Sequence, residues 1–212
     1  MEAYFTPEIP LYAEGRVHSV FKRAINIIMK LPSDERMITL TDSRMPGIPD
    51  SIQLGRVLCS LNTGVPCILW EDELQVGEKR YPFVRQSAEP FFLRYQGLPT
   101  EKERFFNLTE ELCTGLDQLP SVRREYAVKA LCTEKAVKYI GLGPGLTPSF
   151  DDACVGVMAI CRAAGILVPF HICDLSVTTD VSARYLKLAQ GGYFSATLLR
   201  VVDALYGGAD LM

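Results

Sequence analysis

Apolar and polar side chains alternate with a period of two through the first half of the chain, a pattern typical of half-buried β-strands. In residues 24–31, "AINIIMKL", large apolar side chains fall on every second position. These positions are Ile25, Ile27, Met29 and Leu31. After a "PSDE" turn, "RMITLTD" at residues 36–42 returns with Ile38 and Leu40 on its apolar face. The two runs therefore predict a hairpin.

Three more short runs are typical of strands separated by charged turns: "VPCILW" at residues 65–70, "ELQVG" at 73–77 and "KRYPFV" at 79–84. Pro82 cannot donate a ladder hydrogen bond, which confines the last run to a sheet edge or to the start of a strand. "MPGIPD", residues 45–50, has the composition of a turn or loop.

Helical spacing replaces the alternation near residue 100. We expect two amphipathic helices, "TEKERFFNLTEELCTGLDQL" at residues 100–119 and "SVRREYAVKALCTEKAVKYI" at 121–140. The first begins with a capping box formed by Thr100 and Glu103.

Three further helices are expected in the last third of the chain. The first, at residues 149–164, is almost wholly apolar, and such a helix belongs in a core. An extended piece, "ILVPFHI", separates it from helices at 180–190 and 195–206, each followed by Gly-Gly.

The order of these elements predicts an α+β fold. A β-rich N-terminal half, residues 1–98, is expected to form hairpins within a small sheet or barrel. It packs on a helical C-terminal half, residues 99–212, as one compact unit. A chain of 212 residues that is 48% hydrophobic is long enough to bury a full core.

Charge and composition narrow the classes of partner and of site that we expect. The net charge is −3 and no basic stripe exists, so nucleic acid is not an expected partner. No apolar run approaches the roughly 18 residues that span a bilayer, so no membrane partner is expected. "MEAYFTPEIP" at the start lacks the form of a signal peptide, which favours a cytoplasmic location. Seven cysteines without a Cys-x-x-Cys pair, together with two histidines, indicate buried reduced thiols rather than a zinc site.

The most distinctive segment is "GLGPGLTPSFDD", residues 141–152, directly before the apolar helix. Glycines can adopt positive φ, so the loop can turn several main-chain amides toward one point, and the helix start adds unpaired amides and its dipole. Together they predict a site for a small anion. The expected binding residues are Gly143, Gly145, Leu146, Thr147 and Ser149. The lysine that ends a Walker loop is missing, so a P-loop nucleotide site is not supported.

Asp151 and Asp152 complicate this prediction because carboxylates repel an anion. A Mg²⁺ ion between the anion and one or both of these aspartates would reconcile the two features. Alternatively, one aspartate orients the loop and the other transfers a proton. A purely structural interpretation also exists, in which Ser149 and Asp152 form a capping box; it does not explain three glycines and a second acid.

Two other segments carry candidate residues. "VHSVFKRAINI", residues 17–27, alternates polar groups on both faces of a predicted strand, with His18 as a candidate acid or base and Arg23 and Asn26 as substrate ligands. A half-solvated strand with a surface ion pair is the structural alternative.

"TTDVSARYL" offers the hydroxyls of Thr178, Thr179 and Ser182 at a second helix start, which could enlarge the anion site. Capping by Thr179 or Asp180 is the structural alternative. Asp42 is a weaker candidate.

The loop resembles the Gly-Leu-Gly-x-Gly-Leu-Thr-Pro-Ser-Gly-Asp-Asp signature of a bacterial family that includes the third subunit of oxamate carbamoyltransferase, from anaerobic allantoin degradation. "VHSVFKRAINI", "ITLTD" and "TTDVSARYLKLAQGGYFSATL" are also similar to it, so the resemblance runs from about Arg16 to Leu205. Phe150 departs from the signature, because a bulky ring facing the loop replaces a glycine.

The resemblance implies a transferase subunit that acts with two other carbamoyltransferase subunits. The implied reaction converts oxalurate and phosphate to oxamate and carbamoyl phosphate, with Mg²⁺. Asp151, Asp152 and His18 are the expected catalytic residues. A regulatory or assembly subunit that binds an anionic metabolite without doing chemistry is the alternative, and a hydrolase of the same fold is a third.

Overall fold

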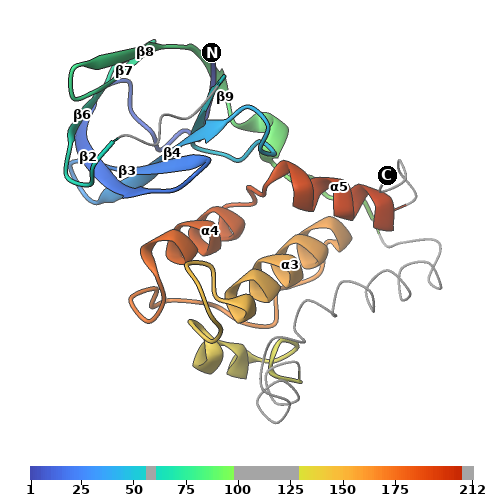
Figure 1. Ribbon diagram of the computed structural model, residues 1–212. Helices are drawn as coiled ribbons and strands as arrows, with labels where there is room; N and C mark the ends of the chain where they lie inside the picture. The colour runs from blue at the N-terminus through green and yellow to red at the C-terminus, as the bar shows by residue number, and fades with distance from the viewer. Residues whose placement is uncertain (56–60, 98–128, 207–212) are drawn as a thin grey trace. The chain divides into compact units, whose positions relative to one another are not determined.

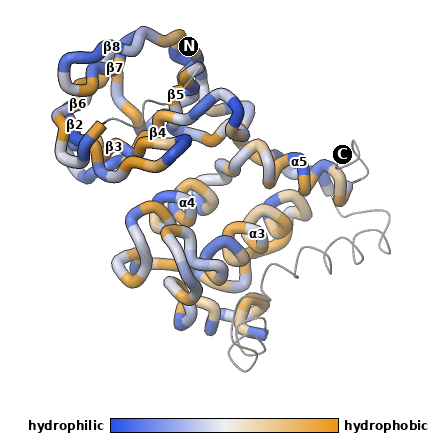
Figure 2. Tube along the Cα trace, viewed as in Figure 1, coloured by the Kyte–Doolittle hydropathy of each residue, from blue (hydrophilic) through white to orange (hydrophobic). Residues whose placement is uncertain are grey.

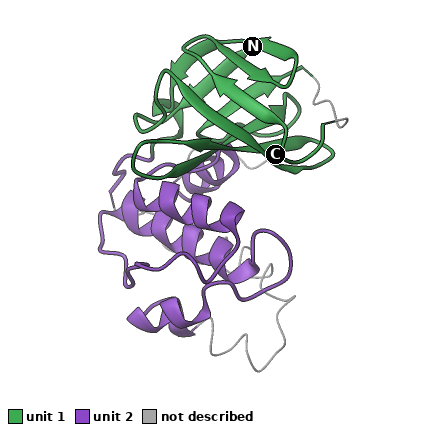
Figure 3. Cartoon of the chain, turned by 90° about the vertical axis from the view of Figure 1, so that its left-hand side faces the viewer, with its two compact units in different colours: residues 1–92 green, residues 93–212 purple. Residues whose placement is uncertain are grey.

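The computed structural model describes residues 1–55, 61–97 and 129–206. The chain divides into two compact units, Met1–Phe92 and Leu93–Met212 (Figure 3). Each unit has its own cluster of buried apolar side chains. The boundary expected between residues 98 and 99 lies outside the described residues.

The described residues of the N-terminal unit form nine strands that curl into a nearly closed barrel (Figure 1). The strands are β1 (Glu2–Phe5), β2 (Ala13–Val20), β3 (Ala24–Lys30), β4 (Glu35–Asp42), β5 (Ser51–Leu54), β6 (Pro66–Leu69), β7 (Glu73–Val76), β8 (Lys79–Pro82) and β9 (Val84–Ser87). Their order in the sheet is β8-β7-β6-β2-β3-β4-β5-β1-β9. A short 3-10 helix, η1 (Glu89–Phe91), follows.

The predicted hairpin is confirmed as the antiparallel pair β3–β4, in which Lys30 lies opposite Glu35. The alternating apolar residues of both strands enter the barrel core, where Ile27, Ile38 and Leu40 have no exposed surface. The predicted short strands at β6, β7 and β8 are also confirmed. Pro82 ends β8, an edge strand of the sheet, as its missing donor requires.

One expectation in this unit is wrong. Residues 17–27 do not form a single strand, because the chain reverses between β2 and β3 and Phe21 N–H donates to the Ala24 carbonyl. The register of β2 against β3 also shifts between Val17 and Ser19, which leaves His18 as the extra residue of a β-bulge. A turn and a bulge both break the period of two, which explains why polar residues seemed to occupy both faces.

In the C-terminal unit, the three helices expected in the last third of the chain are confirmed as α3 (Ser149–Ala164), α4 (Asp180–Gln190) and α5 (Ala196–Leu205). The expected helix at 100–119 lies outside the described residues. The helix expected at 121–140 is confirmed at residues 129–130 of its described part, but it does not continue to residue 140, because a turn follows and a 3-10 helix, η3 (Glu134–Tyr139), begins anew. The Thr133 hydroxyl accepts a hydrogen bond from Lys135 N–H and so competes with a continuous helix.

Helix α3 carries much of the second core. Beyond its first turn it is mostly apolar (Figure 2), and Cys154, Ala159 and Ala163 are fully buried. Phe150 is also fully buried and packs on Tyr139, with ring centroids 5.5 Å apart. The start of α3 is therefore anchored in the core of its unit. With a β-barrel unit followed by a helical unit, the predicted α+β class is confirmed.

The described cysteines are free thiols. Cys67, Cys154 and Cys161 are buried as expected, whereas Cys132 and Cys173 are exposed, so the expectation of buried thiols is wrong for these two. Within the described ranges, no helix is both long and apolar enough to cross a bilayer.

Candidate functional site: the glycine loop

The backbone of the glycine loop, residues 141–147, needs its glycines. Gly141, Gly143 and Gly145 have φ values of 83°, 128° and 90°, which other residues rarely adopt. A Cβ on Gly141 would lie 2.5 Å from the Val177 carbonyl oxygen, and one on Gly143 would lie 2.6 Å from the Ser149 nitrogen. The loop therefore folds back closely onto the start of α3.

Several main-chain amides of this loop are available to a ligand. Among the described residues, no acceptor is found for the amides of Gly143, Gly145, Leu146, Thr147 and Ser149. Neighbouring amides are satisfied, since Leu142 N–H donates to the Tyr139 carbonyl and Phe150 N–H to the Leu142 carbonyl. The available donors thus form one contiguous group at the helix start, as an anion site requires.

Asp151 holds this arrangement in place. Its side chain is buried, and one carboxylate oxygen accepts from Gly141 N–H at 2.7 Å. The other oxygen accepts from the hydroxyls of Thr178 at 2.5 Å and Ser182 at 2.6 Å. One carboxylate therefore joins the loop, α3 and the start of α4.

Thr179 also links the glycine loop to the start of α4. Its side chain caps α4 by accepting from Ser182 N–H at 3.1 Å, and its hydroxyl donates to the Leu146 carbonyl. The structure therefore brings the predicted hydroxyl residues to the loop, but their hydroxyls contact protein groups of the loop and of α3.

Asp152 lies in a different setting from its neighbour. The residue is exposed, yet partial burial of its carboxyl raises its pKa to about 6. The negative charge of Asp151 acts in the same direction, and a hydrogen bond from the Thr147 side chain opposes the rise. A carboxyl with this pKa can both accept and give a proton near neutral pH.

The two capping alternatives have opposite outcomes. The predicted cap by Thr179 on α4 is confirmed. The predicted capping box of Ser149 and Asp152 is wrong, because Ser149 is the first helical residue and Pro148, which has no capping side chain, precedes it. Capping therefore does not account for the serine and the acid at the start of α3.

A magnesium ion held by both aspartates stays a prediction. The three hydrogen bonds to Asp151 occupy both of its oxygens and leave Asp152 as the open carboxylate of the pair. Across the described ranges, no group of three or more His, Cys, Asp or Glu side chains is placed to hold a metal ion. A Mg²⁺ ion here would depend on one protein ligand and on oxygens of the substrate.

The other predicted residues belong to the barrel unit. His18 Nδ1 lies 3.2 Å from the Ser19 hydroxyl, to which Asn26 Nδ2 donates at 3.1 Å. The buried Asn26 also accepts from Thr39 at 2.9 Å, whereas Arg23 is exposed. This hydrogen-bonded row crosses β2, β3 and β4. Sequence reasoning missed Ser19 and Thr39, because ordinary strand hydroxyls give no signal of a network.

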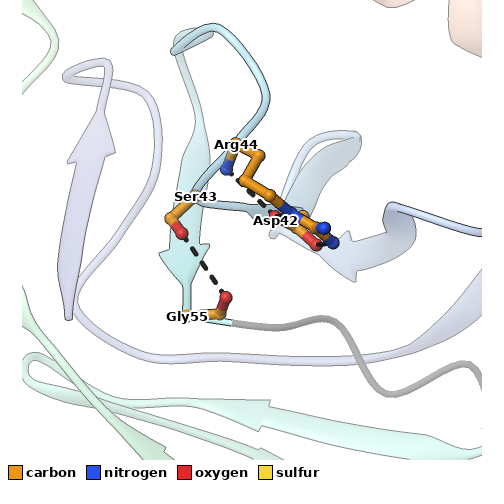
Figure 4. A network of polar contacts seen from close by, with 4 residues as sticks. All are labelled: Asp42, Ser43, Arg44 and Gly55. Carbon is orange, nitrogen blue, oxygen red and sulfur yellow. Dashed lines mark hydrogen bonds and ion pairs between the residues drawn. The ribbon is translucent and has the colours of Figure 1, made fainter.

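Asp42, the weaker candidate, is committed to an ion pair (Figure 4). Its carboxylate accepts from Arg44 Nε at 2.8 Å and from Arg44 Nη2 at 2.5 Å. These bonds hold the pKa of the Asp42 carboxyl well below its usual range. Ser43 beside it donates to the Gly55 carbonyl at 3.4 Å. The pair stabilises the turn after β4.

A surface cavity of about 340 Å³ lies elsewhere on the barrel unit. It is lined by Trp70, Asp72, Glu73, Arg80 and Pro82. The guanidinium of Arg80 lies 5.9 Å from the centre of the Trp70 ring and 3.0 Å from Glu73. None of the predicted site residues lines this cavity.

Comparison with known families agrees with the division into two units. A family model described as oxamate carbamoyltransferase subunit AllH matches residues 139–211, which include the glycine loop and helices α3 to α5. A second model, described as the AllH family N-terminal domain, matches residues 4–85 of the barrel unit. No solved structure matches the chain.

Proposed function

Because the chain belongs to the AllH family of oxamate carbamoyltransferase subunits, we propose that its glycine loop binds phosphate or the phosphate group of carbamoyl phosphate. Because the family is described as one subunit of this enzyme, the enzyme contains further subunits. The proposed reaction is the one that the resemblance implies: oxalurate and phosphate are converted to oxamate and carbamoyl phosphate.

The observation that carries the proposal is the contiguous group of amides without an acceptor among the described residues, from Gly143 to Ser149. Main-chain donors at a helix start bind phosphate through fixed dipoles and need no lysine. The carboxylate of Asp151 supports the site because its three hydrogen bonds fix the loop to α3 and α4. Thr178 and Ser182 position Asp151 in this proposal.

In this proposal, Asp152 is the residue that accepts and donates the protons. When a phosphate oxygen forms a bond to the carbamoyl carbon of oxalurate, phosphate loses a proton and the carbon–nitrogen bond to oxamate breaks. The departing oxamate nitrogen takes up a proton. A carboxyl with a pKa of about 6 can accept the first proton and give the second. Mg²⁺ has no step in this scheme, and catalysis by His18 and binding by Arg23 and Asn26 stay predictions.

The test is calorimetric titration of inorganic phosphate into the chain, with and without Mg²⁺. Gly145→Ala is the informative variant, since Gly145 has a φ of 90° and open space around its Cβ position. Gly64→Ala is the matched control because Gly64, in the barrel unit, has a φ of 82° and equally open space. Both should lose similar stability, but only Gly145→Ala should weaken phosphate binding, by tenfold or more.

Two results would contradict the proposal. Equal phosphate affinity in the two glycine variants would place the anion elsewhere, and no detectable binding to the chain or its complex would remove the site. Full turnover by a reconstituted complex carrying Asp152→Asn, with phosphate still bound, would favour the regulatory alternative instead.

A further inference from the structure

One exposed apolar side chain belongs to the glycine loop, and a second lies beside the loop. Leu146 is 44% exposed and Val177 is 54% exposed. They lie on neighbouring segments, because Thr179 donates to the Leu146 carbonyl and the Val177 carbonyl lies against Gly141. We call this pair the apolar rim. Covering two exposed apolar side chains with an apolar surface of another protein removes them from water, which is favourable.

The polar centre beside the rim has an unbalanced charge. Asp152 is exposed and Asp151 lies next to it, and the groups that act on the Asp152 carboxyl among the described residues are Thr147 and Asp151, neither of which is basic. A bound phosphate would add negative charge at the same place. A positive group from outside the described part of the chain would balance this charge and strengthen phosphate binding.

We propose that a partner subunit of the carbamoyltransferase docks on the apolar rim and inserts an arginine or lysine between the loop phosphate and Asp152. This inference rests on the proposed function of the loop. The partner surface has a stated chemistry, an apolar patch with a basic residue at its centre, which complements the rim and the acid. A basic side chain supplied in trans is a known way to complete a phosphate site.

The experiment compares two single variants in the complex reconstituted with its partner subunits. Val177→Ser changes the side chain of the rim that does not belong to the phosphate-binding loop. Ile166→Ser is the matched control, since Ile166 is 53% exposed, against 54% for Val177, and follows the far end of α3. Assembly is measured by sedimentation, and phosphate affinity by titration of the chain alone and of the complex.

The rim variant should weaken assembly at least tenfold, while the control assembles normally. The unmodified complex should bind phosphate at least tenfold more tightly than the chain alone, and the rim variant should lose this gain without a change in the affinity of the chain alone. Hydrogen exchange at the amides of Gly143, Gly145, Leu146 and Thr147 should slow at least tenfold on assembly, even without phosphate.

Three outcomes would overturn the inference: normal assembly of the rim variant, equal weakening by both variants, or Mg²⁺ alone raising the affinity of the isolated chain to that of the complex. Phosphate bound equally well by chain and complex would also overturn it while leaving the proposed function intact. Phosphate bound by neither would instead refute the proposed function.

Discussion

Two adjacent aspartates at the start of α3 have opposite surroundings. Consecutive helical residues point about 100° apart, so one side chain can enter the core while the next faces out. Asp151 is buried and accepts three hydrogen bonds, whereas Asp152 is exposed and has a raised pKa. The sequence predicts that the pair splits its duties, but it does not say which residue takes which duty.

The raised pKa of Asp152 makes a prediction for stability. A carboxyl whose pKa rises to about 6 on folding costs stability as the pH rises from near 4 through 6. At pH 7.5, Asp152→Asn should therefore be more stable than the unmodified chain in urea denaturation. The expected gain in the free energy of unfolding is about 1 kcal/mol, because solvent screens the exposed side chain. The difference should vanish at pH 4. A variant less stable at pH 7.5 would contradict the raised pKa.

The same carboxyl should control the pH dependence of turnover. If Asp152 accepts the proton of phosphate, activity of the reconstituted complex falls below pH 6, with an acid limb near the pKa of about 6. Asp152→Asn should lower turnover at least a hundredfold and remove that limb. Carbon-13 NMR titration of the labelled carboxyl gives the pKa independently of activity.

Asp151→Asn should act through structure. An amide cannot accept all three hydrogen bonds at once, so one donor among Gly141, Thr178 and Ser182 loses its partner. The expected cost is about 1–3 kcal/mol of unfolding free energy, measured by urea denaturation. Hydrogen exchange at Gly141 should rise as well. Unchanged protection at Gly141 would show that the carboxylate does not hold the loop.

Among the elements, β9 shows how the nearly closed barrel is stabilised at its open seam. β8 and β9 are the edge strands of the sheet order, and Arg85 of β9 binds carbonyls on other segments. It donates to Glu71, Ile9 and Pro10 at 3.1, 3.3 and 3.0 Å, and its guanidinium lies 4.3 Å from the Phe5 ring. One side chain thus joins the end of the sheet to two loops.

Arg85→Ala should therefore destabilise the barrel by about 2–3 kcal/mol, because three carbonyls lose a charged donor. Arg80→Ala is the comparison, since its side chain is 65% exposed and its ion pair with Glu73 should contribute about 0.5 kcal/mol. Urea midpoints of the two variants provide the measurement. Equal effects would mean that the seam does not depend on Arg85.

Elements specified by residues close together in the sequence were predictable, and those specified by distant residues were not. Helices α3 to α5 and the β3–β4 hairpin were predictable because long apolar periodicities and adjacent turns specify them. The parallel pairs β4–β5 and β1–β9 were not, since they join segments without a shared turn. Nor was the role of Asp151, whose partners Thr178 and Ser182 lie about 30 positions later. Such long-range hydrogen bonds leave no periodic trace in a sequence.

At the scale of the whole molecule, two separate cores predict two unfolding events. Among the residues that the structure describes, the barrel core and the core around α3 have no member in common. Calorimetry should resolve two transitions, with Arg85→Ala lowering one midpoint and Asp151→Asn lowering the other. A single transition shifted by both variants would show that the units unfold together.

The lone tryptophan of the chain, Trp70, lies on the barrel unit, beneath the Arg80 guanidinium at the surface cavity. Light absorbed at the red edge of the aromatic band excites this indole alone, so its emission colour reports the solvation of one unit and is blind to the other. Fluorescence and far-ultraviolet dichroism, recorded on one sample, therefore separate the melting of strands from the melting of helices without any label.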